Sequence, residues 1–114
     1  MLEKRLFWLG SSLDDLRAFP EDARRLAGFQ LRRVQHGLDP NDWKPLSIVG
    51  QGVREIRIHT ELEHRIIYVA KFTEGIYVLH AFEKRTRKVS QHDLELARER
   101  LAALLSRGRE NTTR

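Results

Sequence analysis

The chain has 114 residues, of which 40% are hydrophobic and 32% are charged, so it can form one compact domain but not two. It contains no cysteine, which excludes disulfide bonds, thiolate metal sites and a cysteine nucleophile. No apolar run approaches the roughly 20 residues of a membrane span. The first ten residues do not resemble a secretory signal, so we expect a cytoplasmic protein that does not bind membranes.

The net charge is +5, and most of the excess lies in residues 44–88, which carry nine basic and five acidic side chains. Residues 1–43 are neutral, with seven side chains of each sign. Four of the five residues 84–88 are cationic. This uneven distribution predicts a surface that binds a polyanion, although a solvated basic face is the simpler alternative.

The first half of the chain predicts one strand and two helices. Residues 4–9 are aromatic and β-prone, and Gly10 ends them, so we expect a strand. A short helix over 11–17 and a second helix over 20–36 follow, with an N-cap serine and a proline at their starts. The second helix repeats apolar residues at helical spacing, which predicts a buried stripe of Ala23, Leu26, Ala27, Leu31 and Val34.

Residues 38–52 contain turn-forming residues and predict a loop, after which three strands follow over 53–59, 63–72 and 76–82. The turns between these strands are short, which predicts an antiparallel meander. Alternation in the first strand places Ile56 and Ile58 on the same face as Arg54, with Glu55 and Arg57 on the opposite face. The other two strands are apolar on both faces. In the last of them, the same alternation places His80 on one face with Ile76, Val78 and Phe82.

Ser90 and Asp93 form a variant capping box that predicts a closing helix. The buried stripe of this helix is expected to comprise Leu94, Ala97, Leu101 and Leu104. We expect one domain over residues 1–107 and a flexible C-terminal tail over 108–114. The predicted fold is α+β, in the order β-α-α-β-β-β-α, with an antiparallel sheet and helices packed on one face. The other face would then be free to bind a ligand through the basic side chains of the strands.

Three segments of this meander, 53–57, 64–68 and 77–86, resemble the RelE/ParE superfamily of bacterial toxins. They read Val-Arg-Glu-Ile-Arg, His-Arg-Ile-Ile-Tyr and Tyr-Val-Leu-His-Ala-Phe-Glu-Lys-Arg-Thr. Lys-Pro-Leu at 44–46 and the helix segment 93–100 are similar to the HigB-like, phage-derived branch of that superfamily. The resemblance spans about residues 7–105 and implies a RelE-like fold.

The resemblance also implies a function, which is that of the toxin of a type II toxin–antitoxin system. Toxins of this kind include metal-independent, ribosome-dependent mRNA endonucleases without a cofactor, and we expect this activity here. The expected partners are mRNA, the ribosome and a cognate antitoxin, expected to be a helix-turn-helix protein. The alternative on the same scaffold is a ParE-like gyrase poison or a module that binds a partner or nucleic acid without catalysis.

The resemblance and the chemistry of RNA cleavage together give the candidate site residues. The expected catalytic residues are Arg57, Arg65, His80 and Lys84. Arginine binds phosphate bidentately and stays charged, histidine titrates near neutrality, and Lys84 is either a second cation or a proton carrier. The expected RNA-binding residues are Lys44, Arg54, Lys71, Arg85, Arg87 and Lys88. No metal site is expected, because the five histidines lack metal-binding spacing.

Other interpretations of the same residues remain open. Arg57 and Arg65 also suit cross-strand ion pairs with Glu55 or Glu63. His80 equally suits a hydrogen-bonded structural histidine. The basic segment 84–88 suits an acidic segment of an antitoxin as well as RNA, and Lys44 suits an ordinary loop lysine.

Overall fold

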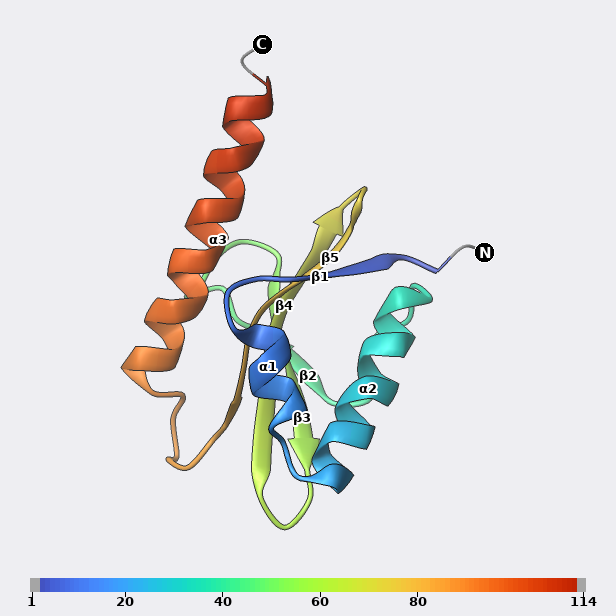
Figure 1. Cartoon of the computed structure of the whole chain (residues 1–114). Coiled ribbons are helices and arrows are strands. Elements are labelled where there is room, and N and C mark those ends of the chain that lie inside the picture. The colour runs from blue at the N-terminus through green and yellow to red at the C-terminus, as the bar shows by residue number, and fades with distance from the viewer. Residues whose placement is uncertain (1–2, 113–114) are drawn as a thin grey trace.

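The computed structural model describes residues 3–112 and consists of a five-stranded sheet flanked by three helices (Figure 1). The strand order across the sheet is β1-β5-β4-β3-β2. The elements in chain order are β1 (Arg5–Trp8), α1 (Ser12–Arg17), α2 (Glu21–Gln35), β2 (Trp43–Pro45), β3 (Val53–His59), β4 (Glu63–Phe72), β5 (Gly75–Glu83) and α3 (Gln91–Thr112). The α+β class predicted from the sequence is therefore confirmed.

The antiparallel meander β3–β4–β5 agrees with the sequence prediction, and β3 and β4 have the predicted bounds. In its register, Arg57 lies directly opposite Arg65. The predicted loop over 38–52 was partly wrong, because β2 lies within it and pairs with the outer edge of β3. Turn-forming residues flank this three-residue strand on both sides, and so short a strand carries no periodicity of its own.

The expectation of an entirely antiparallel sheet was wrong at β1, which pairs in parallel with β5 from Arg5 opposite Gly75 to Trp8 opposite Val78. Tight turns fix the relative direction only of strands that follow one another in sequence. β1 instead pairs with β5, and α1, α2 and three strands lie between the two in the sequence. A connection of this length permits parallel pairing, which no local sequence pattern signals.

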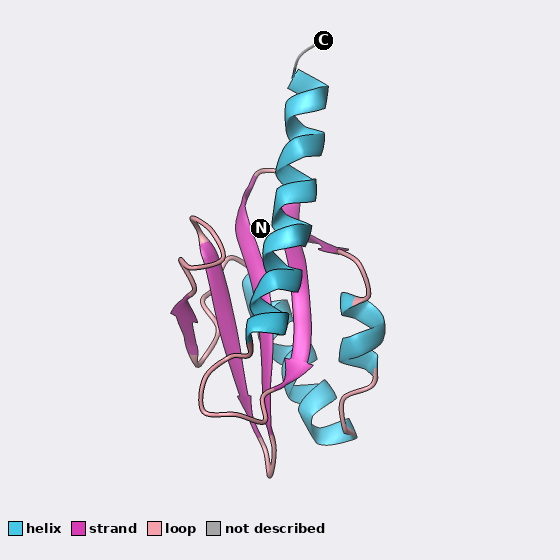
Figure 2. Ribbon diagram, turned by 90° about the vertical axis from the view of Figure 1, so that its left-hand side faces the viewer, coloured by secondary structure: helices cyan, strands magenta, loops and turns pink. Residues whose placement is uncertain are grey.

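Helices cover both faces of the sheet, so the prediction that they pack on one face was also wrong (Figures 1 and 2). On one face, α1 and α2 pack on a core that includes Ile56, Ile66 and Val78. On the other, α3 packs on a second core that includes Ile67 and Val69. The physical reason is already present in the strands, because β4 and β5 are apolar on both sides and each side must be shielded from water.

A β-bulge at Leu79 changes the side-chain alternation of β5. Val78 pairs with Tyr68, whereas His80 pairs with the preceding residue, Ile67, so Leu79 is the extra residue. Up to Val78 the even-numbered residues face α1 and α2, and beyond the bulge His80 and Phe82 face α3. The expectation that His80 shares a face with Ile76 and Val78 was therefore wrong. Strict alternation cannot anticipate an inserted residue.

One further helix prediction requires correction, and the extent of the last helix can be stated. Leu26 was expected in the buried stripe of α2 but is 41% exposed, because the contact surface of α2 is narrow and Ala23, Ala27, Leu31 and Val34 fill it. α3 continues to Thr112, beyond residue 107, where the domain was expected to end, and residues 113–114 of the predicted tail lie outside the described residues. The stripe predicted for α3 is buried and packs on the sheet.

Candidate functional site

A groove opens on the α3 face of the sheet, where β3 and β4 extend beyond the helix. We call it the cationic groove, and its volume is about 300 Å³. Six basic side chains and one acidic side chain line it, namely Lys44, Arg57, Arg65, Lys84, Arg87, Lys88 and Glu55. The apolar part of the lining comes from Leu46, Ile48, Val89 and Leu94. Six of the candidate residues predicted from the sequence therefore lie together.

Strand pairing brings the two candidate arginines together on this face. Arg57 of β3 and Arg65 of β4 are direct cross-strand neighbours, an arrangement that is destabilising for like charges. Glu55 precedes Arg57 by two residues, so it points to the same face. Its Oε1 lies 3.8 Å from Arg57 Nε and 3.9 Å from Arg65 Nε, and 3.8 Å from Lys44 Nζ. One carboxylate therefore offsets the repulsion among three cations.

The carboxylate of Glu55 neutralises these cations without saturating them. The Glu55 side chain is 1% exposed, and distances of 3.8–3.9 Å are ion-pair contacts rather than hydrogen bonds. Within residues 3–112, the buried Nε atoms of Arg57 and Arg65 have no hydrogen-bond partner, and neither does Glu55 Oε2. The Arg57 side chain is nevertheless 34% exposed, and its accessible guanidinium nitrogens can donate to an oxyanion such as a phosphate.

Arg65 is the most buried cation of the groove and is held from behind. Its side chain is 7% exposed, and its Nη1 donates to Glu63 Oε1 at 2.9 Å and to the carbonyl of His64 at 3.0 Å. Glu63 in turn accepts from His59 Nδ1 at 2.8 Å, and His59 Nε2 lies 2.5 Å from Asp42 Oδ2. This chain of charged groups fixes the orientation of the Arg65 guanidinium.

His59, the histidine of this network of charged groups, is stabilised in its charged form. Hydrogen bonds to Asp42 and to Glu63 raise the pKa of His59 above its ordinary value. The hydrogen bond from His59, with a smaller effect of Arg65, lowers the pKa of Glu63. The carboxylate that holds Arg65 is therefore kept ionised.

The basic segment after β5 closes one side of the groove. Lys84 Nζ donates to the carbonyls of Thr86 at 2.9 Å and Arg87 at 2.7 Å, so this side chain holds the turn of the segment together. The Lys84 side chain therefore lines the groove and also fixes the conformation of the segment that follows β5. Arg85 is not part of the lining, because it turns outward and pairs with Glu83 at 3.2 Å.

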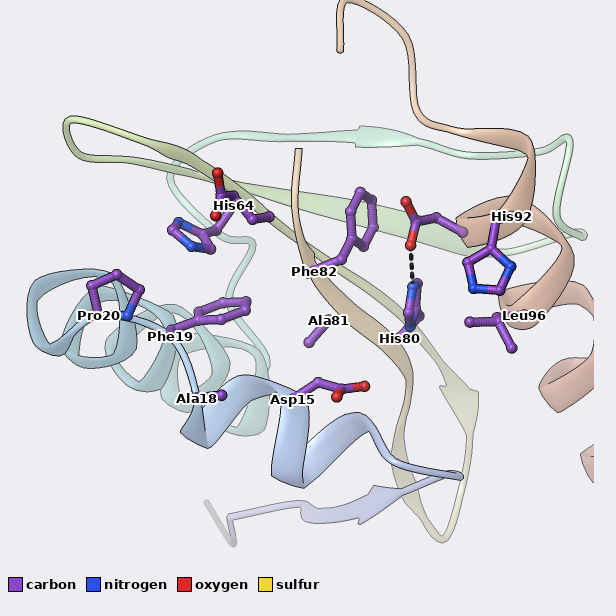
Figure 3. A pocket seen from close by; sticks show the side chains of 12 residues that line it. Asp15, Ala18, Phe19, Pro20, His64, His80, Ala81, Phe82, His92 and Leu96 are labelled. Atoms are coloured by element: carbon purple, nitrogen blue, oxygen red, sulfur yellow. Dashed lines mark hydrogen bonds and ion pairs between the residues drawn. The ribbon is translucent and has the colours of Figure 1, made fainter. Parts of the chain in front are cut away.

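His80 lies outside the cationic groove and is fully engaged in protein contacts (Figure 3). Its Nε2 lies 2.6 Å from Asp93 Oδ1, and its Nδ1 lies 3.3 Å from Nη1 of Arg100. A guanidinium only donates, so Nδ1 accepts and the proton sits on Nε2, facing Asp93. With both ring nitrogens occupied and the residue 4% exposed, His80 fastens α3 to β5. This geometry favours the structural interpretation over the catalytic one.

Two other candidate RNA-binding residues lie away from the cationic groove. Arg54 stacks over the ring of Trp43 at 4.0 Å and donates to Asp39 at 2.9 Å. Lys71 donates to the carbonyl of Gln51 at 3.1 Å. Both line a separate pocket on the face that carries α1 and α2, as expected for Arg54 from strand alternation. Their contacts are internal and do not extend the groove.

Sequence reasoning considered Glu55 and Glu63 only as possible ion-pair partners and missed their organising role. The signal was present, since Glu55 shares strand alternation with Arg57, but the burial of Glu55 depends on β2, which was not predicted. Asp42 and His59 come together through the hairpin and the edge strand.

Within residues 3–112, no three acidic or histidine side chains are arranged to hold a metal ion. No helix of the described part of the chain is long and apolar enough to cross a membrane.

Comparison with known proteins identifies a family that the sequence matches. The family model described as phage derived protein Gp49-like (DUF891) matches residues 14–102, more than three quarters of the chain. The chain belongs to this family. The Gp49-like proteins are a RelE-like toxin family, so the resemblance noted in the sequence is confirmed at that level. A comparison with curated proteins gives no match.

Proposed function

We propose that this Gp49-like protein is the toxin of a type II toxin–antitoxin system and cleaves mRNA on the ribosome without a metal ion. The observation that carries the proposal is the pair Arg57 and Arg65, which lie opposite each other in a groove that four other cations also line. The cationic groove suits the phosphates of a single RNA strand. Such a toxin acts in the cytoplasm, and its proposed partner is a helix-turn-helix antitoxin.

Cleavage of RNA requires stabilisation of the extra negative charge that develops on the phosphate as the 2′-hydroxyl attacks it. In this proposal Arg57 and Arg65 donate to these oxygens, and the hydrogen bond to Glu63 orients Arg65. Preorganised donors of this kind contribute about 3 kcal/mol each to the transition state. Lys44, Lys84, Arg87 and Lys88 would bind the flanking phosphates through charge.

The test uses purified protein, translating ribosomes and a defined mRNA, in the presence of a metal chelator that leaves the ribosome intact. We expect new 5′ ends within translated codons, and Arg57→Ala is expected to lower the cleavage rate by about 10²–10³-fold. Arg57 is the better variant because its side chain is 34% exposed, whereas Arg65 is buried against Glu63. The matched control is Arg32→Ala on the exposed surface of α2, which should leave cleavage unchanged.

Two outcomes would contradict the proposal, and one would invalidate the assay. Cleavage that survives in a folded Arg57→Ala protein would remove the groove from the mechanism. Cleavage that stops in the Arg32→Ala control would mean that the assay reports folding. DNA damage without transcript cleavage after induced expression would favour the gyrase alternative on the same scaffold.

A further inference from the structure

The two faces of the sheet are covered unequally. α1 and α2 together pack on the first face, whereas α3 is the one helix of the described chain on the second. The last described side chain of α3 in that core is Leu104, and the helix then continues to Thr112, about two turns further. This end of α3 projects past the sheet, so it leaves part of the second face without a helix over it (Figures 1 and 2).

A groove of about 730 Å³ lies at this place, between the end of α3, β1 and the β4–β5 hairpin. We call it the aromatic groove. The apolar side chains that β1 and the hairpin contribute are only partly buried, and they include Phe7, Leu9, Phe72 and Tyr77. On the α3 wall, Leu105 is 37% exposed. Large apolar side chains that gather around a groove and stay in contact with water are typical of a binding site.

The aromatic rings of this groove pack on one another, which argues against a platform for nucleobases. Phe7 and Tyr77 are stacked with their ring centroids 4.8 Å apart, and Phe72 meets Tyr77 edge to face at 5.5 Å. The guanidinium of Arg5 lies over the Phe7 ring at 5.0 Å. These contacts use ring faces on which a base would stack. The groove is therefore better suited to the apolar side chains of a polypeptide, which need contact area rather than a free ring face.

The charge around the aromatic groove indicates which kind of polypeptide fits. Arg107 lines the groove from α3, and Arg5 stands at the β1 side. The one acidic residue of the lining is Glu74, which accepts a hydrogen bond from the Tyr77 hydroxyl at 3.0 Å. Two guanidinium groups against one carboxylate favour a partner with acidic side chains around an apolar surface. A second copy of this chain, with its net charge of +5, is disfavoured by repulsion.

The shape of the α3 wall favours a helix as the occupant. Gly108 follows Leu104 by four residues and lines the same groove, and a Cβ atom added there would meet no other atom within 4 Å. A partner backbone can therefore approach α3 closely at this position. A helix satisfies its own main-chain hydrogen bonds, which apolar walls cannot do for an extended segment. It would also give the second face two helices, as on the first face.

We propose that the aromatic groove binds an acidic amphipathic helix of a partner polypeptide. The apolar stripe of the helix would lie against Phe72, Tyr77 and Leu105. Carboxylates at the margins of the stripe would pair with Arg5 and Arg107. This proposal does not depend on RNA cleavage, because the cationic groove lies nearer the start of α3 and shares no lining residue with the aromatic groove.

The test is an NMR titration of the isotope-labelled full chain with a capped peptide of about 18 residues, long enough to form a helix on binding. Leucines recur in it at helical spacing, and glutamate and alanine fill the other positions. We expect the amide signals of Tyr77, Leu105 and Gly108 to shift. A peptide of the same composition in scrambled order, and one with lysine in place of glutamate, should each bind at least about tenfold more weakly.

Two variants test the position and the charge of the bound peptide. Gly108→Glu places bulk and negative charge on the α3 wall and should weaken binding of the glutamate peptide by about tenfold, while its better helix propensity preserves the fold. The matched control is Gly28→Glu on the exposed side of α2, where an added Cβ also meets no atom within 4 Å. Arg5→Glu combined with Arg107→Glu should weaken binding by about tenfold as well.

Several results would overturn the proposal. An absence of shifts at Tyr77, Leu105 and Gly108 would do so, as would equal binding of the scrambled or the lysine peptide. Unchanged binding by Gly108→Glu would place the peptide elsewhere. Shifts of the same amides on dilution of the protein alone would make a second copy the occupant. Shifts of these amides with single-stranded oligouridylate would make the groove a nucleic-acid site instead.

Discussion

The cationic groove and a second pocket of about 400 Å³, which we call the edge groove, differ in the side chains that line them. The edge groove lies between α1, the end of β5 and the start of α3. Consecutive residues of β4 serve the two, since Arg65 lines the first and His64 lines the second. The pleat of the strand directs a charged arginine to one side of the sheet and a neutral histidine to the other. A sheet of this size can therefore present a basic groove and a pocket lined by no lysine or arginine only a few residues apart.

The two grooves also differ in how their charges are compensated. In the cationic groove, the carboxylate of Glu55 lies within 4 Å of three cations. In the edge groove, His80 contacts both Asp93 and Arg100, so the charges of these two residues are compensated by neighbouring protein groups. Asp15 lies at the rim of the groove. The comparison therefore predicts that Glu55 is the residue on which the stability of the cationic groove depends most.

The largest expected effect is that of Glu55→Ala. The substitution leaves Arg57 and Arg65 as direct cross-strand neighbours without their shared counter-ion. Loss of one partner of a buried ion pair costs about 3–5 kcal/mol, and partial exposure of Arg57 places this case near the lower end, at about 3 kcal/mol. Urea unfolding measures the change, and Glu61→Ala on the exposed β3–β4 turn is the control.

A matched double variant sharpens this prediction. Glu55→Met together with Arg65→Met removes both charges and should be more stable than Glu55→Ala alone, because Arg57 then no longer faces a second arginine without the shared carboxylate. A loss below about 1 kcal/mol in Glu55→Ala would mean that water screens the groove as it does a surface ion pair. The preorganised character of the cationic groove would then be wrong.

The meander was predictable because its information is local. Alternation and short turns fix the bounds and directions of β3 and β4 and the common face of Glu55 and Arg57. The pairing of β1 with β5 was not predictable, because it joins distant parts of the chain and leaves no periodic signal. Helices on both faces were predictable in principle, since β4 is apolar on both sides, but the prediction did not carry that observation through.

The candidate site shows the same limit at the level of single residues. Arg57 and Arg65 lie on neighbouring strands, as predicted, because these strands pair in simple register. His80 was misplaced by the bulge at Leu79, and Lys71 by its contact with the carbonyl of Gln51. The position of a basic residue along a strand is therefore predictable from the sequence. The groove that its side chain enters depends on inserted residues and on contacts with distant parts of the chain.

The second prediction concerns His80→Ala, which tests whether the histidine belongs to the edge or to the catalytic chemistry. The substitution leaves the partly buried Asp93 without its ring donor and loosens the attachment of α3 to β5. We expect a loss of stability of about 2 kcal/mol, with His92→Ala near zero because His92 is exposed. Transcript cleavage per folded molecule should be unchanged.

The outcome separates the two roles of this histidine. Loss of cleavage with stability retained would make His80 catalytic and would contradict the structural interpretation. Loss of both in proportion would show that the histidine acts through folding alone. Thermal unfolding of the same samples supplies the folded fraction that this comparison needs.

The smallest expected effect is a pH dependence from the chain Asp42–His59–Glu63. Because the pKa of His59 is raised, its contribution to stability is complete below its ordinary value of 6.5 and is lost as the pH rises through the folded-state pKa. Because the pKa of Glu63 is lowered, its contribution is present above its ordinary value of 4.5 and is lost as the pH falls. The two together therefore stabilise the fold most between these values.

His59→Gln should consequently destabilise the protein more at about pH 5.5 than at about pH 8.5. The difference should stay below about 1 kcal/mol, because exposed ion pairs are screened by solvent, and the His59 side chain is 51% exposed. Urea unfolding at the two pH values measures it, with His36→Gln at the exposed end of α2 as the control. A larger loss at the higher pH would mean that neutral His59 makes the stronger contacts, and Glu63 would then hold Arg65 without help from a charged histidine.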